Sequence, residues 1–311
     1  AYRSKYLYVM QKQGTTWNTI RFDDNGRYPS IALDDAGKPH MTYYRSSNQK
    51  VYYVRTVNAG TGNCGPNVSW ACEELPSSAF NFGAPKGRSA ITVRGNKVTI
   101  IYDVPGTSQY LSRILMVEKV IGSTSWINSR EISLTEQGAP ELSIQHDQDG
   151  LPNVLIQSLY IDWYKVKPVG LQALEGRGDF ALTSAGNPRL CYRDSVANRL
   201  IYALSNGVSY WTEKVLDYDI STLGNCSIAI APPGATGIVQ VGLYNPRVAY
   251  YDSGSNALKY AIHPILTNTN WSVQTVDTPT GTRKFDLHLD RQARPTIIYF
   301  DSTSKKLKIA K

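Results

Sequence analysis

Four arginines recur at comparable places along the chain, each just before a segment that we expect to be a β-strand. They are Arg27, Arg88, Arg177 and Arg283. Guanidinium groups gathered on one surface repel one another unless an anion compensates them, and they bind carboxylate, sulfate or phosphate with paired hydrogen bonds. The pattern therefore predicts an anion-binding site, provided that the fold brings these segments together.

Three carboxylates lie a few residues after the same strand entries, at Glu141, Asp179 and Asp286. In one interpretation they line the ligand site together with the arginines. In the other, acids and arginines pair with one another as a structural collar and no ligand is needed. The sequence leaves both interpretations open.

An aromatic cluster around Trp163 has no counterpart in the other repeats described below, and it offers a second candidate binding surface. Exposed aromatic rings stack on sugar rings, so Trp163 is a candidate platform for a glycan. The four histidines are candidates for a catalytic base, and we expect His288, which alternates with two leucines, to be structural. They are His40, His146, His263 and His288.

The chain repeats itself, and these repeats must position the candidate residues. The segment Ser30-Ile-Ala-Leu-Asp-Asp-Ala-Gly-Lys-Pro-His-Met-Thr-Tyr-Tyr has near-copies that begin at Phe180 and Leu287. Weaker copies run from Ala90, from Glu141 and through Pro246. Each unit consists of a strand, a turn with Gly or a small residue, a strand, a polar turn and a third strand. A fourth strand, marked by Trp, follows in most units, as at Trp70.

Four short antiparallel strands repeated every 40–60 residues or so are typical of a β-propeller blade. We predict a single all-β domain over residues 1–311, a six-bladed propeller of four-stranded antiparallel blades, with seven blades as the alternative. The last unit ends after three strands, so the strand around Trp17 is expected to complete it and close the ring. In such a ring the first strands of all blades meet at the centre, where the four arginines would converge.

The repeat that begins Ser30-Ile-Ala-Leu-Asp-Asp-Ala-Gly resembles the blade repeat of sialidase-like (BNR-type) bacterial extracellular propellers. The resemblance covers essentially the whole chain. It implies the propeller fold, because the complete Asp-box motif Ser-x-Asp-x-Gly-x-x-Trp of true sialidases is absent. Fold does not determine function, so the activity has to be argued from the site.

The same resemblance implies an enzymatic alternative. Sialidases use an arginine cluster to hold a carboxylate, a tyrosine nucleophile helped by a carboxylate, and an aspartic acid. By analogy Arg27, Arg88 and Arg283 would be the clamp, with Asp179 or Asp286 as the acid. No tyrosine–glutamate pair can be assigned from the sequence, which weakens the analogy.

The cysteines, Cys64, Cys72, Cys191 and Cys226, are even in number. Cys64 and Cys72 flank a turn-rich stretch and are expected to form a local disulfide, whereas Cys191 and Cys226 lie on neighbouring repeats and could pair or stay free. Zinc is disfavoured, because no second Cys pair or His pair has ligand spacing. The even count in a chain rich in Tyr, Ser and Asn favours a secreted or cell-surface location.

The composition excludes several classes of protein. Of 311 residues 41% are hydrophobic, so the chain can build a core, and no run of about 18 apolar residues could span a membrane. The net charge of +8 is spread along the chain rather than clustered, so no nucleic-acid partner is expected. No cofactor or metal motif is recognised. Asp23-Asp-Asn-Gly and Asp147-Gln-Asp-Gly resemble calcium loops but are better explained as turns.

The sequence therefore predicts an extracellular, lectin-like or adhesive propeller that binds an anionic or carbohydrate surface component. Two alternatives remain. One is a glycan-cleaving enzyme, either a glycoside hydrolase or a polysaccharide lyase, and the other is a scaffold for protein partners.

Overall fold

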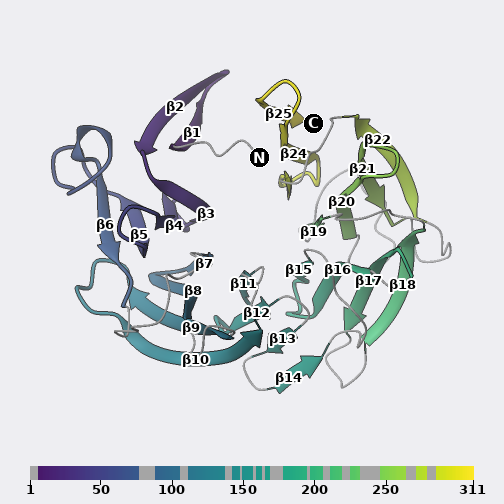
Figure 1. The fold of residues 1–311 in the computed structure, drawn as a ribbon, viewed down its shortest axis with the longest axis horizontal. Helices are drawn as coiled ribbons and strands as arrows, with labels where there is room; N and C mark the ends of the chain where they lie inside the picture. The colour runs from purple at the N-terminus through teal and green to yellow at the C-terminus, as the bar shows by residue number, and fades with distance from the viewer. Residues whose placement is uncertain are drawn as a thin grey trace. The chain divides into compact units, whose positions relative to one another are not determined.

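Over the residues that it describes, the computed structural model consists of β-strands with one short 3-10 helix (Figure 1). It describes residues 6–76, 88–105, 111–136, 142–147, 149–156, 159–162, 165–168, 178–194, 197–205, 211–218, 225–231, 246–263, 271–278 and 285–311. The chain divides into two compact units, Ala1–His146 and Asp147–Lys311. We call them unit 1 and unit 2 and describe each by itself.

Unit 1 begins with the hairpin β1–β2, followed by two four-stranded antiparallel sheets and one further strand. The strands are β1 (Leu7–Gln13), β2 (Thr16–Asp23), β3 (Gly26–Leu33), β4 (Pro39–Arg45), β5 (Lys50–Thr56), β6 (Trp70–Glu74), β7 (Ser89–Arg94), β8 (Lys97–Pro105), β9 (Leu111–Val120), β10 (Ile127–Glu136) and β11 (Leu142–His146), with the helix η1 (Pro66–Val68) before β6. The sheets run in the order β3-β4-β5-β6 and β7-β8-β9-β10, so every strand pairs with its neighbour in the sequence.

Unit 2 repeats the same meander. Its strands are β12 (Pro152–Ile156), β13 (Leu159–Asp162), β14 (Lys165–Pro168), β15 (Asp179–Leu182), β16 (Pro188–Asp194), β17 (Arg199–Ser205), β18 (Trp211–Asp217), β19 (Cys226–Ile230), β20 (Pro246–Asp252), β21 (Ala257–Ile262), β22 (Ser272–Asp277), β23 (Phe285–Leu289), β24 (Pro295–Asp301) and β25 (Lys306–Ala310). The sheet orders are β11-β12-β13-β14, β15-β16-β17-β18, β19-β20-β21-β22 and the three-stranded β23-β24-β25.

These sheets confirm the prediction of an all-β propeller with four-stranded antiparallel blades. The predicted count of six such blades is wrong: the described residues form five four-stranded sheets, one three-stranded sheet and one hairpin. The strand around Trp17, β2, pairs with β1 through the Trp17–Lys12 register, and its expected pairing with the last unit stays a prediction. The hairpin with β1 provides hydrogen-bond partners for backbone groups of β2 from the neighbouring strand in the sequence. Ring closure and the single domain stay predictions.

The turn between the first two strands of a sheet explains the Asp-x-x-Gly sequence that begins at Asp34 and again at Asp147. The Asp34 carboxylate accepts hydrogen bonds from the backbone N–H groups of Ala36 and Lys38, and Gly37 takes a left-handed φ of 73°. Asp147 and Asp290 cap their turns in the same way. Asp147 therefore caps a turn, as predicted.

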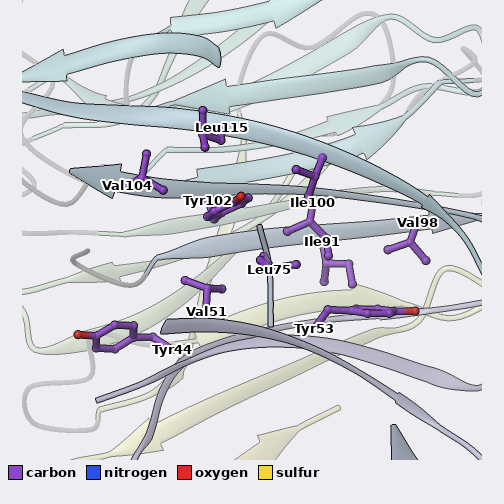
Figure 2. Close-up of a cluster of buried hydrophobic side chains, with 11 residues drawn as sticks. Tyr44, Val51, Tyr53, Leu75, Ile91, Val98, Ile100, Tyr102, Val104 and Leu115 are labelled. Atoms are coloured by element: carbon purple, nitrogen blue, oxygen red, sulfur yellow. The ribbon is translucent and has the colours of Figure 1, made fainter. Parts of the chain in front are cut away.

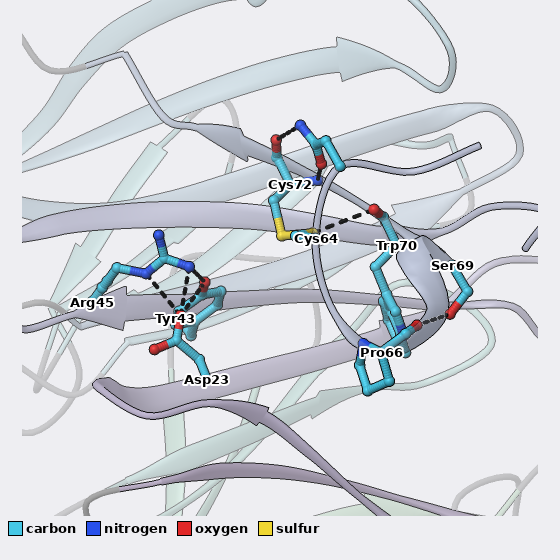
Figure 3. The surroundings of a disulfide bond; sticks show 9 residues. Asp23, Tyr43, Arg45, Cys64, Pro66, Ser69, Trp70 and Cys72 are labelled. Carbon is cyan, nitrogen blue, oxygen red and sulfur yellow. Dashed lines mark hydrogen bonds and ion pairs between the residues drawn. A yellow bond between two sulfur atoms is a disulfide. The ribbon is translucent and has the colours of Figure 1, made fainter. Parts of the chain in front are cut away.

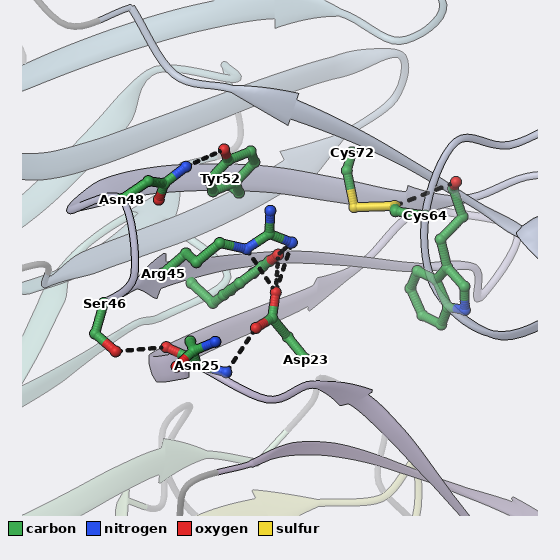
Figure 4. Close-up of polar contacts among 10 residues, drawn as sticks. Asp23, Asn25, Arg45, Ser46, Asn48, Tyr52, Cys64 and Cys72 are labelled. Carbon is green, nitrogen blue, oxygen red and sulfur yellow. Dashed lines mark hydrogen bonds and ion pairs between the residues drawn. A yellow bond between two sulfur atoms is a disulfide. The ribbon is translucent and has the colours of Figure 1, made fainter.

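The other calcium-like segment is also a turn, as Figure 4 shows. The Asp23 Oδ1 accepts a hydrogen bond from the Asn25 N–H at 2.7 Å, and its Oδ2 accepts from the Tyr43 hydroxyl and the Arg45 guanidinium. No group of three or more acidic, His or Cys side chains within the described ranges could hold a metal ion.

Each unit has its core between successive sheets. In unit 1 the side chains of β5, β7 and β8 interdigitate (Figure 2). Tyr53 meets Trp126 edge-on, with ring centroids 5.5 Å apart. In unit 2 Tyr202 meets Trp271 in the same manner at 5.2 Å. Trp126 and Trp271 thus pack sheet on sheet, as expected for the tryptophans that mark the fourth strands.

Both cysteine pairs are bonded, and the described chain has no free cysteine. Cys64–Cys72 closes the loop that contains η1, where Cys64 also contacts the carbonyl of Trp70 (Figure 3). Cys191–Cys226 joins β16 to β19 and therefore ties two sheets of unit 2 together. The pairing left open by the sequence is settled. Across the described residues, no helix has the length and apolarity that crossing a membrane requires.

Candidate functional site

Of the eight predicted ligand-binding residues, the structure describes four. Arg27 and Arg88 lie at the starts of first strands in unit 1, whereas Asp179 and Asp286 lie at the starts of first strands in unit 2. The other four, Arg177, Arg283, Glu141 and Trp163, lie outside the described residues.

In unit 1, the start of β3, which is the first strand of its sheet, has a backbone conformation that exposes Tyr28 to solvent. Gly26 must be glycine, because a Cβ there would come within 2.7 Å of the Leu7 Cβ. After it the β3–β4 register shifts between Arg27 and Ser30, which indicates a bulge. Tyr28 adopts a left-handed φ of 53° within this bulge although Pro29 follows it, and its side chain is 39% exposed. Among the described non-glycine residues with positive φ, it alone lies inside a strand.

Strained backbone of this kind costs about 1–3 kcal/mol and persists where the surrounding structure enforces it, often at functional sites. Here the strain turns an aromatic ring toward solvent. The Arg88 guanidinium lies 5.7 Å from the centroid of the Tyr28 ring, within the range of a cation–π contact. Arg27 is paired in register with Tyr44 on the neighbouring strand β4. We call Arg27, Tyr28, Tyr44 and Arg88 the arginine–tyrosine cluster.

A buried carboxylate helps to position this cluster. Asp103 is 1% exposed, and its Oδ1 accepts a hydrogen bond from the Arg88 backbone N–H at 2.7 Å. Burial, and then the negative charge of Asp103, raises the pKa of Tyr44, while the positive charge of Arg27 opposes that rise. The two arginines thus share their surroundings with tyrosine rings and one acid, an arrangement that can hold an anion next to an aromatic face.

In unit 2 the two predicted aspartates are linked through a residue that we did not predict. Ser227 on β19 places its Oγ 3.2 Å from the Asp179 Oδ2 on β15 and 3.2 Å from the Asp286 Oδ1 on β23. The Leu287 N–H donates to the same Oγ at 3.2 Å. One hydroxyl therefore separates the two carboxyl groups, which we call the carboxyl pair.

Burial, reinforced by the nearby charge of Asp286, raises the pKa of Asp179 from its ordinary value of 3.8 to about 6. Hydrogen bonds from the backbone N–H groups of Phe180 and Ile228 oppose the rise without cancelling it. The pKa of Asp286 is also raised, because surrounding protein atoms displace water from its carboxyl even though the side chain is exposed. Such a pair can hold a proton near neutral pH.

The two aspartates of the carboxyl pair lie at a position that recurs in the repeat, where a side chain of one first strand can accept a hydrogen bond from a backbone N–H of the next first strand. Ser30 accepts a hydrogen bond from the Ile91 N–H of the next first strand, Asp179 accepts from Ile228, and Ser227 accepts from Leu287. We call this place the ladder position. By alignment of the first strands its occupants are Ser30, Ala90, Ser143, Asp179, Ser227 and Asp286.

Sequence reasoning missed Tyr28 and Ser227 as site residues. The ladder position could have revealed Ser227, because Ser30-Ile-Ala-Leu, Asp179-Phe-Ala-Leu and Ser227-Ile-Ala-Ile align without gaps. Tyr28 could not have been found in this way, since its exposure depends on a bulge that the sequence does not specify.

Three of the four histidines make side-chain contacts with residues in or next to neighbouring strands, and the structural role expected for His288 stays a prediction. Burial lowers the pKa of His40, whose Nδ1 lies 2.6 Å from the Tyr53 hydroxyl. His146 contacts Thr99 at 2.9 Å, and His263 packs edge-on against Trp271. His288 is exposed and alternates with the buried Leu287 and Leu289, as the sequence predicted.

Comparison with known proteins gives the fold and no family. No protein-family model matches the chain, and no curated protein matches its sequence. Among solved structures it is similar to a mutant of the Aleuria aurantia lectin in complex with Fucα1-6GlcNAc, with 11% identity over 94% of this chain and 96% of that chain and a TM-score of 0.54.

Two further similar structures are enzymes. The Penicillium chrysogenum α-L-arabinanase complexed with arabinobiose shares 10% identity over 98% of this chain and 96% of that chain, with a TM-score of 0.53. The polysaccharide lyase Uly1 shares 10% identity over 99% and 88%, with a TM-score of 0.52. The fold class is thus the β-propeller, which here has both carbohydrate-binding and glycan-cleaving neighbours. The resemblance to sialidase-like propellers in particular stays a prediction.

Proposed function

We propose that this protein is an extracellular carbohydrate-binding propeller whose arginine–tyrosine cluster binds an acidic glycan. The observation that carries the proposal is the strained, solvent-facing Tyr28 with Arg88 beside its ring. An aromatic ring provides a stacking surface for a sugar, and guanidinium groups provide paired hydrogen bonds for a carboxylate or sulfate. A purely structural collar would need neither the exposed ring nor the strained backbone.

The proposed location rests on the two disulfides, which persist in oxidising compartments. The similar lectin and glycan-active structures support a carbohydrate as the ligand class. The net charge of +8 favours an acidic glycan over a neutral one, because it raises the local concentration of anions.

A glycan array with uronate, sialylated, sulfated and neutral members tests the proposal. Tyr28→Ala is expected to weaken binding to the acidic members roughly 10-fold, the equivalent of one lost contact of about 1.4 kcal/mol. Arg88→Ala is expected to weaken the same interactions by a similar factor and to leave binding to neutral glycans unchanged.

Two matched variants serve as controls in the same unit. Tyr8→Ala removes another exposed tyrosine, and Arg21→Ala removes an arginine that is already paired with Asp24 and stacked over Tyr6. Neither should alter binding. If Arg88→Ala lowered the melting temperature and left acidic-glycan binding intact, the arginines would belong to a structural collar and the proposal would fail.

A further inference from the structure

In unit 2 the single hydroxyl proton of Ser227 has two possible acceptors, the carboxyl groups of Asp179 and Asp286. Ser227 can donate to Asp179 or to Asp286 at any moment, and its Oγ already accepts from the Leu287 N–H. If both carboxyl groups were ionised, one carboxylate oxygen would face the serine oxygen with no proton between them. A further proton on one carboxyl removes this repulsion, so the three side chains favour a singly protonated state.

The fold itself does not require these acids. In unit 1 the ladder position holds Ser30, which accepts the same kind of inter-strand N–H bond from Ile91 with a neutral hydroxyl. Ser227 does likewise for Leu287. Surrounding protein atoms displace water from both carboxyl groups, which costs desolvation free energy that a hydroxyl avoids, so structure alone favours serine at positions 179 and 286 as well. The carboxyl groups of Asp179 and Asp286 therefore point to chemistry rather than to architecture.

The two acids differ in their access to a ligand. Asp179 is half-buried, and its oxygens accept from the Phe180 N–H at 2.9 Å, the Ile228 N–H at 3.0 Å and the Ser227 hydroxyl. Asp286 is exposed at its place on β23. Asp286 can therefore touch a bound molecule, whereas Asp179 is held in place and acts through Ser227.

We propose that Asp286, Ser227 and Asp179 form an acid–base relay that hydrolyses a glycosidic bond, with the glycan substrate class taken from the proposed function. Protonated Asp286 gives its proton to the glycosidic oxygen while the bond from the anomeric carbon to that oxygen breaks and its electron pair stays on the oxygen. Water forms the new bond to the anomeric carbon and releases a proton to the ionised relay. The relay thus ends with the proton it started with, and nothing is oxidised or reduced.

In this division of roles Asp286 is the catalytic residue, and Asp179 is a positioning residue that tunes the acidity of Asp286 through Ser227. The acidic glycans bound in the array experiment serve as substrates, with release of reducing ends as the readout. Asp286→Asn is expected to lower the turnover number at least about 100-fold and to leave KM unchanged. Asp179→Asn is expected to lower it about 10-fold and to shift the acid limb of the pH–rate profile, which a merely structural residue would not do.

Asp290→Asn is the matched control, because Asp290 lies on the same sheet in an exposed turn that asparagine also supports. It should retain full activity. If Asp286→Asn fails to fold, Asp286→Ser is the second variant, since it copies the residue of β3 and β19 at the ladder position. Thermal unfolding of each variant separates loss of chemistry from loss of structure.

The outcomes separate the two proposals. Binding of acidic glycans without any release of reducing ends overturns the relay and leaves the proposed function intact. Release that depends on Asp286 but not on Tyr28 or Arg88 supports the relay and overturns the proposed binding site. Products that carry the ultraviolet absorbance of an unsaturated uronate indicate elimination, which overturns hydrolysis by the relay.

Discussion

In both units a side chain at the ladder position accepts a hydrogen bond from a backbone N–H of the next first strand, but the type of side chain differs between the units. In unit 1 the hydroxyl of Ser30 accepts the Ile91 N–H, and the next first strand has Ala90 at the equivalent place. In unit 2 the run Asp179, Ser227 and Asp286 links three successive first strands. The difference shows that the repeat tolerates a hydroxyl, a methyl group or a carboxyl there, so the acids of unit 2 are not imposed by the fold.

The segments that lead into the first strands contain arginines in both units, with Arg177 and Arg283 at these places in unit 2. In unit 1 they provide Arg27, Tyr28 and Arg88, which are cationic and aromatic, next to a neutral ladder position. In unit 2 the described residues provide an acidic ladder position with raised pKa values. The units therefore differ in the ladder position beside these segments: unit 1 has Ser30, Ala90 and Ser143 there, whereas unit 2 has carboxyl groups that can hold a proton.

The two disulfides offer the largest effect with which to test this contrast. Cys191–Cys226 spans 35 residues and joins two sheets, whereas Cys64–Cys72 spans eight and closes a loop. Chain entropy predicts losses of about 4 and about 2.5 kcal/mol on replacing each pair by alanine. Urea denaturation of Cys191→Ala/Cys226→Ala and Cys64→Ala/Cys72→Ala measures both. Equal losses would contradict a sheet-joining role that is specific to unit 2.

The next largest effect is the pH dependence that Asp179 contributes in unit 2, opposite in sign to the one that His40 contributes in unit 1. Because the pKa of Asp179 is raised to about 6, the folded state prefers its protonated form. Its contribution to stability is full below about pH 4 and is lost as the pH rises through 6, by about 3 kcal/mol in all.

Urea denaturation at pH 4.5 and 7.5 tests this expectation. Asp179→Ser, which copies Ser30, should remove the loss of stability that Asp179 causes between these two pH values and stabilise the protein at the higher pH. A variant with the same pH dependence as the natural chain would show that Asp179 is not the group that takes up the proton.

The smallest expected effect concerns Ser30 itself. Ser30→Ala leaves the Ile91 N–H without its acceptor and is expected to cost about 1 kcal/mol. The loss should be independent of pH between 4.5 and 7.5, because no carboxyl group takes part in this contact. A pH-dependent loss would mean that the ladder position of unit 1 is coupled to a titrating group and would break the contrast between the units.

Much of the fold could be predicted from particular residues. The Asp-x-x-Gly turns, the Pro-led second strands and the tryptophans at or just before fourth strands indicate where many of the hairpins begin and end. Local turn chemistry and alternation of side chains act within a few residues, so the sequence can show them. The count of complete blades was predicted wrongly, because the residues around β1 and β2 form a hairpin and the described residues form five four-stranded sheets. The Cys191–Cys226 bond was left open by the sequence, because it depends on β16 and β19 lying side by side.

The sequence by itself determined the repeat, the strand order within each sheet and the types of group that stand at the starts of the first strands. Only the tertiary structure decided that Ser227 lies between Asp179 and Asp286 and that Tyr28 faces solvent in a strained bulge. The reason is physical: hairpins are encoded by neighbours in the chain, whereas a shared proton depends on distances between side chains on three strands that are about 50 or more residues apart.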